Sequence, residues 1–163
     1  MTTERSRTIE WPDPAPIAAA ASGRTGLEFL RAMLKGSVSP PPIGVLMGFA
    51  LEHVGEGVAR FRGQASEPLY NPMGTVHGGV AATLLDSAMG SAVMTTCDAR
   101  TAYTTVDLVV HLTRPITLRT GALVAEGRIA HRGSRVATAT GELRDVEGRL
   151  LAHGSTTCLL FER

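Results

Sequence analysis

The chain has 163 residues, 44% of them hydrophobic and 19% charged, which is ordinary for one globular domain with its own hydrophobic core. A formal net charge of +1 at pH 7 excludes bulk electrostatic attraction to nucleic acid or to an acidic membrane surface. No apolar run approaches the roughly 20 residues that cross a bilayer, and the two cysteines have no metal-ligand spacing, so a cytoplasmic protein without membrane or nucleic-acid partners is expected.

The N-terminal part of the chain predicts a tail, a helix and a hairpin. Residues 1–24 begin as a polar, proline-rich stretch, so a loose tail is expected there, followed by one domain over residues 25–163. Apolar residues then recur at helical spacing up to a run of three prolines, which predicts an N-terminal helix over residues 25–35. Loose alternation around a Gly-Glu-Gly sequence predicts a β-hairpin over residues 44–64.

A long central helix is predicted over residues 78–95. Its side chains are apolar or small nearly all round, and Asp86 is its only ionisable group, so the helix is expected to be buried on most sides. Leu84, Leu85 and Ala88 share one face, which we expect to meet a sheet. Asp86 lies on the opposite side, among small residues.

The rest of the chain predicts β-structure. Four alternating runs with turn sequences between them predict antiparallel strands over residues 103–113, 122–130, 135–143 and 150–161. One sheet that curls around one apolar helix is the simplest way to bury that helix. The sequence therefore predicts an α+β fold in which an antiparallel sheet wraps the central helix.

The most informative stretch precedes and enters the central helix. It places Asn71, five further residues, His-Gly-Gly at residues 77–79, six further residues, and then Asp86. With this spacing at a junction between loop and helix, the chain resembles the phenylacetate-degradation (PaaI-like) branch of the hotdog-fold acyl-CoA thioesterases, over roughly residues 43–161.

The resemblance implies a hotdog fold and the hydrolysis of a fatty or aromatic acyl-CoA without a metal or an organic cofactor. It also implies a homodimer with shared active sites, or a dimer of such dimers. The family's catalytic residues fall on Asn71, His77, Gly78, Asp86 and Thr104. Thr105 is adjacent to Thr104, and the hydroxyl group of this strand could come from either.

Gly78 is suited to stabilise the negative charge that develops on a thioester oxygen. Backbone N–H groups in the first turn of a helix are unpaired and lie at the positive end of the helix dipole. Without a side chain, Gly78 lets a carbonyl group come close, and one such donor is typically worth about 3–4 kcal/mol in the transition state. We expect Gly79 to lie beside the substrate; alternatively, both glycines only permit tight packing of the helix entry.

Asp86 is expected to act as nucleophile or general base. Burying an isolated carboxylate on an apolar helix costs free energy, and carboxylates in such places often have a function. The alternative is a structural Asp86 bonded to the backbone or to an arginine. Asn71 either positions the loop for catalysis or simply forms a turn before Pro72. His77 either caps the helix or helps to hold the carbonyl group.

Arginines on turns are the candidates for CoA phosphates: Arg114, Arg132 and Arg135. Exposed arginines are common on turns, and solvated side chains remain the alternative. The other histidines show no ligand spacing, so no metal is expected.

Gly78 and Asp86 are eight residues apart, about 12 Å along one helix. An amide and a carboxylate that serve the same thioester should lie within roughly 5–7 Å of each other. A two-fold axis that brings Gly78 of one subunit to Asp86 of the other resolves this conflict.

Two other functions remain open on the same fold. A hotdog acyl-CoA hydratase or dehydratase carries its acid on a differently spaced loop, and the Leu-Tyr-Asn-Pro sequence at residues 69–72 lacks the preceding Gly-Asp of that pattern. A non-catalytic acyl-CoA-binding protein would bind the ligand without turnover.

Overall fold

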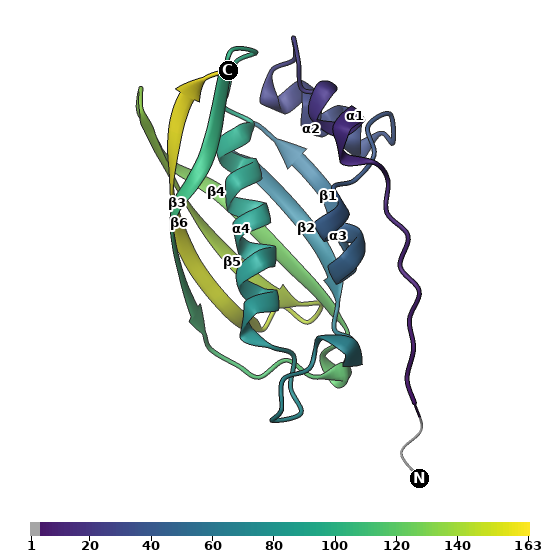
Figure 1. Cartoon of the computed structure of the whole chain (residues 1–163). Helices are drawn as coiled ribbons and strands as arrows, with labels where there is room; N and C mark the ends of the chain where they lie inside the picture. The colour runs from purple at the N-terminus through teal and green to yellow at the C-terminus, as the bar shows by residue number, and fades with distance from the viewer. Residues whose placement is uncertain (1–3) are drawn as a thin grey trace.

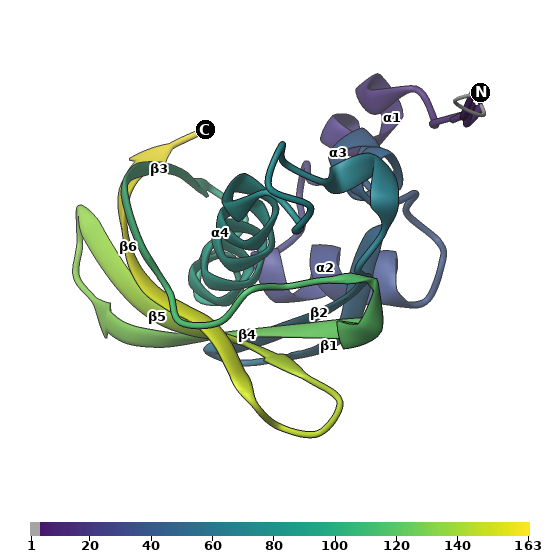
Figure 2. The same ribbon diagram turned by 90° about the horizontal axis from the view of Figure 1, so that it is seen from below.

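The structure, a computed structural model, describes residues 4–163. In chain order its elements are α1 (Pro14–Ala19), α2 (Gly26–Leu34), α3 (Pro42–Met47), β1 (Phe49–Gly55), β2 (Val58–Gln64), η1 (Glu67–Leu69), α4 (Gly78–Met94), β3 (Thr101–Leu112), η2 (Leu118–Thr120), β4 (Ala122–Arg132), β5 (Val136–Asp145) and β6 (Leu150–Glu162). The strands form one antiparallel sheet in the order β1-β2-β4-β5-β6-β3. This sheet curls around α4, as Figures 1 and 2 show, and the predicted hotdog fold is confirmed.

Three short helices precede the sheet, where the sequence predicted one. The loose tail expected over residues 1–24 contains α1, which begins with Pro14 after Asp13; the Asp13 carboxylate accepts the Ala15 N–H at 2.9 Å. The hairpin expected over residues 44–64 begins later, at Phe49, because α3 occupies the chain before it. Gly48, at φ +74°, ends α3 and turns the chain into β1.

The predicted helix over residues 25–35 is α2. Its N-terminus is a capping box in which Thr25 and Glu28 bond each other's backbone N–H groups. Phe29 and Leu30 are buried in the core, so these two residues serve packing. The Gly26 N–H donates to the Cys97 carbonyl at 2.9 Å, which ties α2 to the chain just after α4.

The sheet-facing side of α4 is as predicted, with Leu84, Leu85 and Ala88 at most 1% exposed. A close approach of helix and sheet depends on Gly127 of β4, where a Cβ atom would lie 2.4 Å from the Ala88 backbone. The core is therefore built between one face of α4 and the concave face of the sheet (Figure 2).

The four C-terminal strands match the predicted ranges closely, and β3 forms one edge of the sheet, paired with β6. Within residues 4–163, no helix has both the length and the apolar character needed to cross a membrane.

Candidate active site

The loop before α4 is held in shape by Asn71. Its Oδ1 accepts the backbone N–H groups of Met73 at 2.9 Å and Thr75 at 3.2 Å, and its Nδ2 donates to the Thr75 hydroxyl at 2.9 Å. The Asn71 N–H also donates to the Thr75 carbonyl at 2.8 Å. All these bonds stay inside the loop, so Asn71 forms the turn that the sequence left as one alternative.

His77 is the N-cap residue of α4. Its Nδ1 accepts the Gly79 N–H at 2.9 Å, so a neutral His77 carries its proton on Nε2. This bond occupies the donor of Gly79, which the sequence placed beside the substrate. The Gly78 N–H, in contrast, has no hydrogen-bond partner among residues 4–163. An unpaired donor therefore remains at the positive end of the helix dipole.

A pocket of about 260 Å³ opens at this end of α4. It is lined by Asn71, Thr75, Val76, His77, Gly78, Ala81, Leu112, Thr113, Arg114, Pro115 and Ile116. The fold thus brings together four residues that the sequence singled out: Asn71, His77, Gly78 and Arg114. Nη1 of Arg114 donates to the Leu150 carbonyl at 2.6 Å, which leaves its other N–H groups for an anion.

Asp86 lies further along α4, where the helix passes β3. Its Oδ1 accepts the hydroxyl of Thr105 at 2.9 Å, and its Oδ2 has no hydrogen-bond partner in the described part of the chain. Neither an arginine nor a backbone N–H pairs with this carboxylate within residues 4–163. Asp86 is partly exposed, so its free oxygen is open to a water molecule or a substrate.

Thr105, and not Thr104, is the hydroxyl partner of Asp86, which corrects the assignment from the sequence. Thr104 is exposed and lies opposite Leu159 of β6, on the outer side of the sheet. A β-bulge between Thr105 and Asp107 is the physical reason, because it switches which residues of β3 face inward. Strand alternation counted back from Leu112 leads to Thr104, and the bulge moves the inward position to Thr105.

Two of the three candidate arginines lie elsewhere in the subunit. Arg132 is the last residue of β4 and lies near Cys97, just past the C-terminus of α4. Burial raises the pKa of the Cys97 thiol, and the positive charge of Arg132 partly offsets this effect. Arg135 follows in the turn to β5. Both therefore lie at the opposite end of α4 from the pocket of Gly78 and Arg114.

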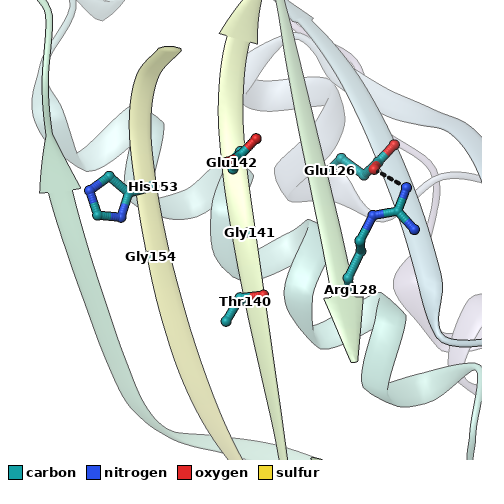
Figure 3. A pocket seen from close by; sticks show the side chains of 7 residues that line it. All are labelled: Glu126, Arg128, Thr140, Gly141, Glu142, His153 and Gly154. Atoms are coloured by element: carbon teal, nitrogen blue, oxygen red, sulfur yellow. Dashed lines mark ion pairs between the residues drawn. The ribbon is translucent and has the colours of Figure 1, made fainter. Parts of the chain in front are cut away.

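A second hollow, of about 420 Å³, lies on the outer face of the sheet (Figure 3). Its lining is Glu126, Arg128, Thr140, Gly141, Glu142, His153 and Gly154. Partial burial opposes ionisation of Glu126, but hydrogen bonds from Arg60 and Arg128 outweigh it and hold the pKa of this carboxyl below its usual range. A carboxylate held as an ion is a poor base, so this hollow is a weaker candidate for catalysis than the pocket at Gly78.

His111 and His153 are directly opposite each other on β3 and β6, with ring centroids 5.0 Å apart. Among residues 4–163, no group of three or more acidic, histidine or cysteine side chains could hold a metal ion.

Comparisons with known proteins show which family the sequence matches. Residues 73–152 match the family model of the thioesterase superfamily. A Halobacterium salinarum protein that bears an esterase name is 34% identical in an alignment 113 residues long, which covers 66% of this chain and 73% of that protein.

Solved structures are similar as well. A Ralstonia eutropha protein, named as a thioesterase related to phenylacetic acid degradation, has a TM-score of 0.72 at 27% identity, with 80% of this chain and 98% of that chain covered. A mutant of the phenylacetic acid degradation protein PaaI from Thermus thermophilus has a TM-score of 0.67 at 25% identity, with 73% and 98% covered.

Proposed function

Because this chain belongs to the thioesterase superfamily, we propose that it hydrolyses acyl-CoA thioesters at composite sites shared by the two subunits of a homodimer. The observation that carries the proposal is the unpaired Gly78 N–H, which opens into a pocket at the N-terminus of α4 while His77 occupies the next donor. A helix start with one free donor facing a pocket is suited to hold an oxyanion.

In the proposed reaction the thioester oxygen accepts the Gly78 N–H as the carbonyl carbon is attacked. The positive end of the α4 dipole adds to this stabilisation, and one such donor is typically worth about 3–4 kcal/mol. The tetrahedral intermediate then expels CoA as a thiolate, which takes up a proton from water. His77, whose Nδ1 is occupied, presents its Nε2–H as a second donor near the pocket.

Asp86 enables the attack on the carbonyl carbon in one of two ways: as a general base that removes a proton from water, or as a nucleophile that bonds to the carbon itself. Its Oδ1 is fixed by the Thr105 hydroxyl, which orients the carboxylate and leaves Oδ2 free. In the first route, water adds to the carbon while Oδ2 takes its proton. In the second route, an acyl-Asp86 anhydride forms and water hydrolyses it.

One subunit does not bring Gly78 and Asp86 to the same thioester. They are eight residues apart on α4, which corresponds to about 12 Å along the helix axis. A two-fold axis that places Gly78 of one subunit beside Asp86 of the other creates two complete sites per dimer.

The edge strand β3 supports such a dimer. One side of this twelve-residue strand pairs with β6, apart from the bulge at Val106. Its exposed apolar side chains include Val106, Leu108, Val109 and Leu112, which are 37–59% exposed. A long apolar edge strand is a ready template for pairing with another chain. Pairing of β3 with its copy would also bring the two α4 helices near each other, since β3 flanks α4 (Figure 2).

The same symmetry gives the distant arginines a role. If Gly78 meets Asp86 of an antiparallel partner helix, the C-terminal end of that helix lies about 12 Å beyond Gly78. Arg132 and Arg135 of the other subunit are then on the side of Arg114, where CoA phosphates would lie. We propose that these three arginines bind CoA from two subunits.

A thiol-release assay across saturated acyl-CoAs of several lengths, and across aromatic ones, tests the proposal. Saturated substrates have no double bond to hydrate, so CoA release from them distinguishes hydrolysis from hydration. The matched control is Asp86→Asn, which keeps size and shape. Binding of acyl-CoA without CoA release, or release that is equally fast with Asp86→Asn, would overturn the proposed function.

A further inference from the structure

The bulge in β3 is the feature that points Thr105 toward Asp86. Val106 is the extra residue of this bulge, since its neighbours Thr105 and Asp107 lie opposite adjacent residues of β6. Asp107 is exposed on the outer side of the sheet, and in a regular strand the residue two positions earlier would face the same way. Thr105 faces α4 only because the bulge interrupts this alternation.

A buried hydroxyl on β6 bonds the backbone of β3 at this bulge. Oγ1 of Thr156 donates to the carbonyl of Asp107 at 2.8 Å. Thr156 is only 1% exposed, and its cross-strand neighbours are Leu108 and Ala139, both apolar. A buried hydroxyl without a partner costs free energy, and a bulge disturbs the regular backbone ladder. The bond therefore satisfies the Thr156 hydroxyl and holds the first residue after the bulge.

The inner face of β6 connects Thr156 with Thr105. Cys158 is fully buried two residues after Thr156 and lies directly opposite Thr105. Its thiol lies beside the hydroxyl groups of both threonines, and burial raises the pKa of this thiol, so the group stays uncharged. Thr156 thus bonds the backbone of β3 on one side of the bulge, while Thr105, on the other side, bonds the Asp86 carboxylate.

Resting on the proposed thioesterase reaction, we infer that Thr156 is a positioning residue, whose hydroxyl holds the bulge that turns Thr105 toward Asp86. Thr156 acts on the reaction only through Thr105. The alternative is a purely structural role, in which the hydroxyl is satisfied within the core and its loss lowers stability alone. The two roles predict different kinetics when the Thr105 hydroxyl has already been removed.

Three single variants give the first test, with CoA release as the signal. Thr156→Val keeps the shape and removes the hydroxyl, and it should lower kcat by about three- to tenfold with KM within about twofold, since the orientation of Asp86 is disturbed. Thr156→Ser keeps the hydroxyl and should have a kcat within about twofold of wild type. Thr157→Val is the matched control, because Thr157 is the next residue and lies opposite Asp107 on the outer side; it should have wild-type kinetics.

The double variant separates positioning from a general loss of stability. In a Thr105→Val background the hydroxyl that Thr156 positions is already absent, so adding Thr156→Val should change kcat by less than about twofold. If Thr156→Val lowers kcat by the same factor in both backgrounds, the two residues act independently, and the inference is overturned.

The geometry can also be measured without any substrate. Crystal structures of wild type and of Thr156→Val should show that the 2.9 Å bond from Thr105 to Asp86 is lengthened or lost in the variant. Thermal melts show whether each variant is folded, and Thr156→Ala replaces Thr156→Val if the latter does not fold. A folded variant that keeps this bond and the wild-type kcat would overturn the inference and leave the proposed function intact. If wild-type protein releases no CoA from any acyl-CoA, the proposed function fails, and a positioning role in that reaction fails with it.

Discussion

The hydroxyl of Thr105 donates to Oδ1 of Asp86 at 2.9 Å, which joins the edge strand β3 to the middle of α4. This bond fixes one carboxylate oxygen and leaves the other free, as expected for a group that attacks or activates water. We predict that Thr105→Val, which keeps the shape and removes the hydroxyl, lowers kcat about tenfold or more. The matched variant Thr104→Val, on the outer side of β3, should have wild-type kinetics; equal effects of the two variants in steady-state assays would contradict the assignment.

Asp86→Asn should lower kcat by about a hundredfold or more and leave KM within a few-fold, because the carboxylate is used mainly in the transition state. The substitution is nearly isosteric, and its side-chain oxygen can still accept from Thr105, so the melting temperature should change little. Steady-state kinetics with CoA release as the signal measures the effect. If Asp86→Asn retains a tenth or more of the wild-type kcat, Asp86 is not a catalytic residue.

Gly78 allows the backbone donor to be tested directly. Proline is well tolerated at the first position of a helix, and His77 already has the extended backbone that a following proline requires (φ −58°, ψ 135°). Gly78→Pro therefore removes the N–H group while α4 persists, and we predict a loss of about a hundredfold or more in kcat.

Gly78→Ala is the matched control for this variant, because it adds a Cβ atom and keeps the N–H group. In both variants the new Cβ would lie 2.6 Å from Cδ1 of Leu112, an exposed side chain that can move away. We expect the alanine variant to lose less activity than the proline variant. Equal losses in kcat would show that the added carbon, and not the missing donor, is responsible.

A stability prediction concerns Asp145, the last residue of β5 before the turn to β6. Burial opposes its ionisation, but hydrogen bonds from the Arg149 side chain and from the backbone N–H groups of Arg149 and Glu147 hold its pKa below its usual range. Because the folded pKa lies below the unfolded value of about 3.9, the stabilisation is complete above that pH and is lost as the pH falls through the folded pKa.

Asp145→Asn should therefore lower the melting temperature at neutral pH, and the difference from wild type should shrink below about pH 4. Melting curves of both proteins across this pH range measure it. Glu147→Gln removes an exposed partner of Arg149 and should have little effect at any pH. If the difference in melting temperature between Asp145→Asn and wild type stays constant into strong acid, the Asp145 carboxylate is not the source of the stabilisation.

The central helix could be predicted from the sequence because its side chains are apolar or small nearly all round, with Asp86 as its only ionisable residue. The pocket residues Asn71, His77 and Gly78 could be predicted because they are close in sequence and their spacing is specific. The loop and the helix start then bring them together without help from distant parts of the chain.

Features that depend on pairing between distant strands were not predictable. The choice between Thr104 and Thr105 depends on a bulge in β3, which strand alternation does not reveal. The hydrogen bond from Thr156 to the Asp107 carbonyl depends on how β6 is placed against that bulge. The short helix α3 was missed because its six residues are too few to show a helical period.

The last prediction tests whether the site is shared between subunits. Gly78→Pro lacks the proposed oxyanion donor and Asp86→Asn lacks the carboxylate, so each variant should be nearly inactive alone. When the two are unfolded together and refolded, random pairing makes about half of the dimers mixed. In a mixed dimer, the Gly78 of one subunit meets the Asp86 of the other at one site, while the second site lacks both groups. Activity should therefore return to about a quarter of the wild-type value.

Each variant refolded alone must stay inactive, and native mass spectrometry must show the mixed dimer. A site contained within one subunit predicts a different result, because every subunit then carries one lesion and no pairing restores activity. Inactive mixtures in which mixed dimers are present would thus contradict the two-fold model. Because Gly78 and Asp86 of one subunit are about 12 Å apart along α4, that result would also mean that these two residues do not act on the same thioester.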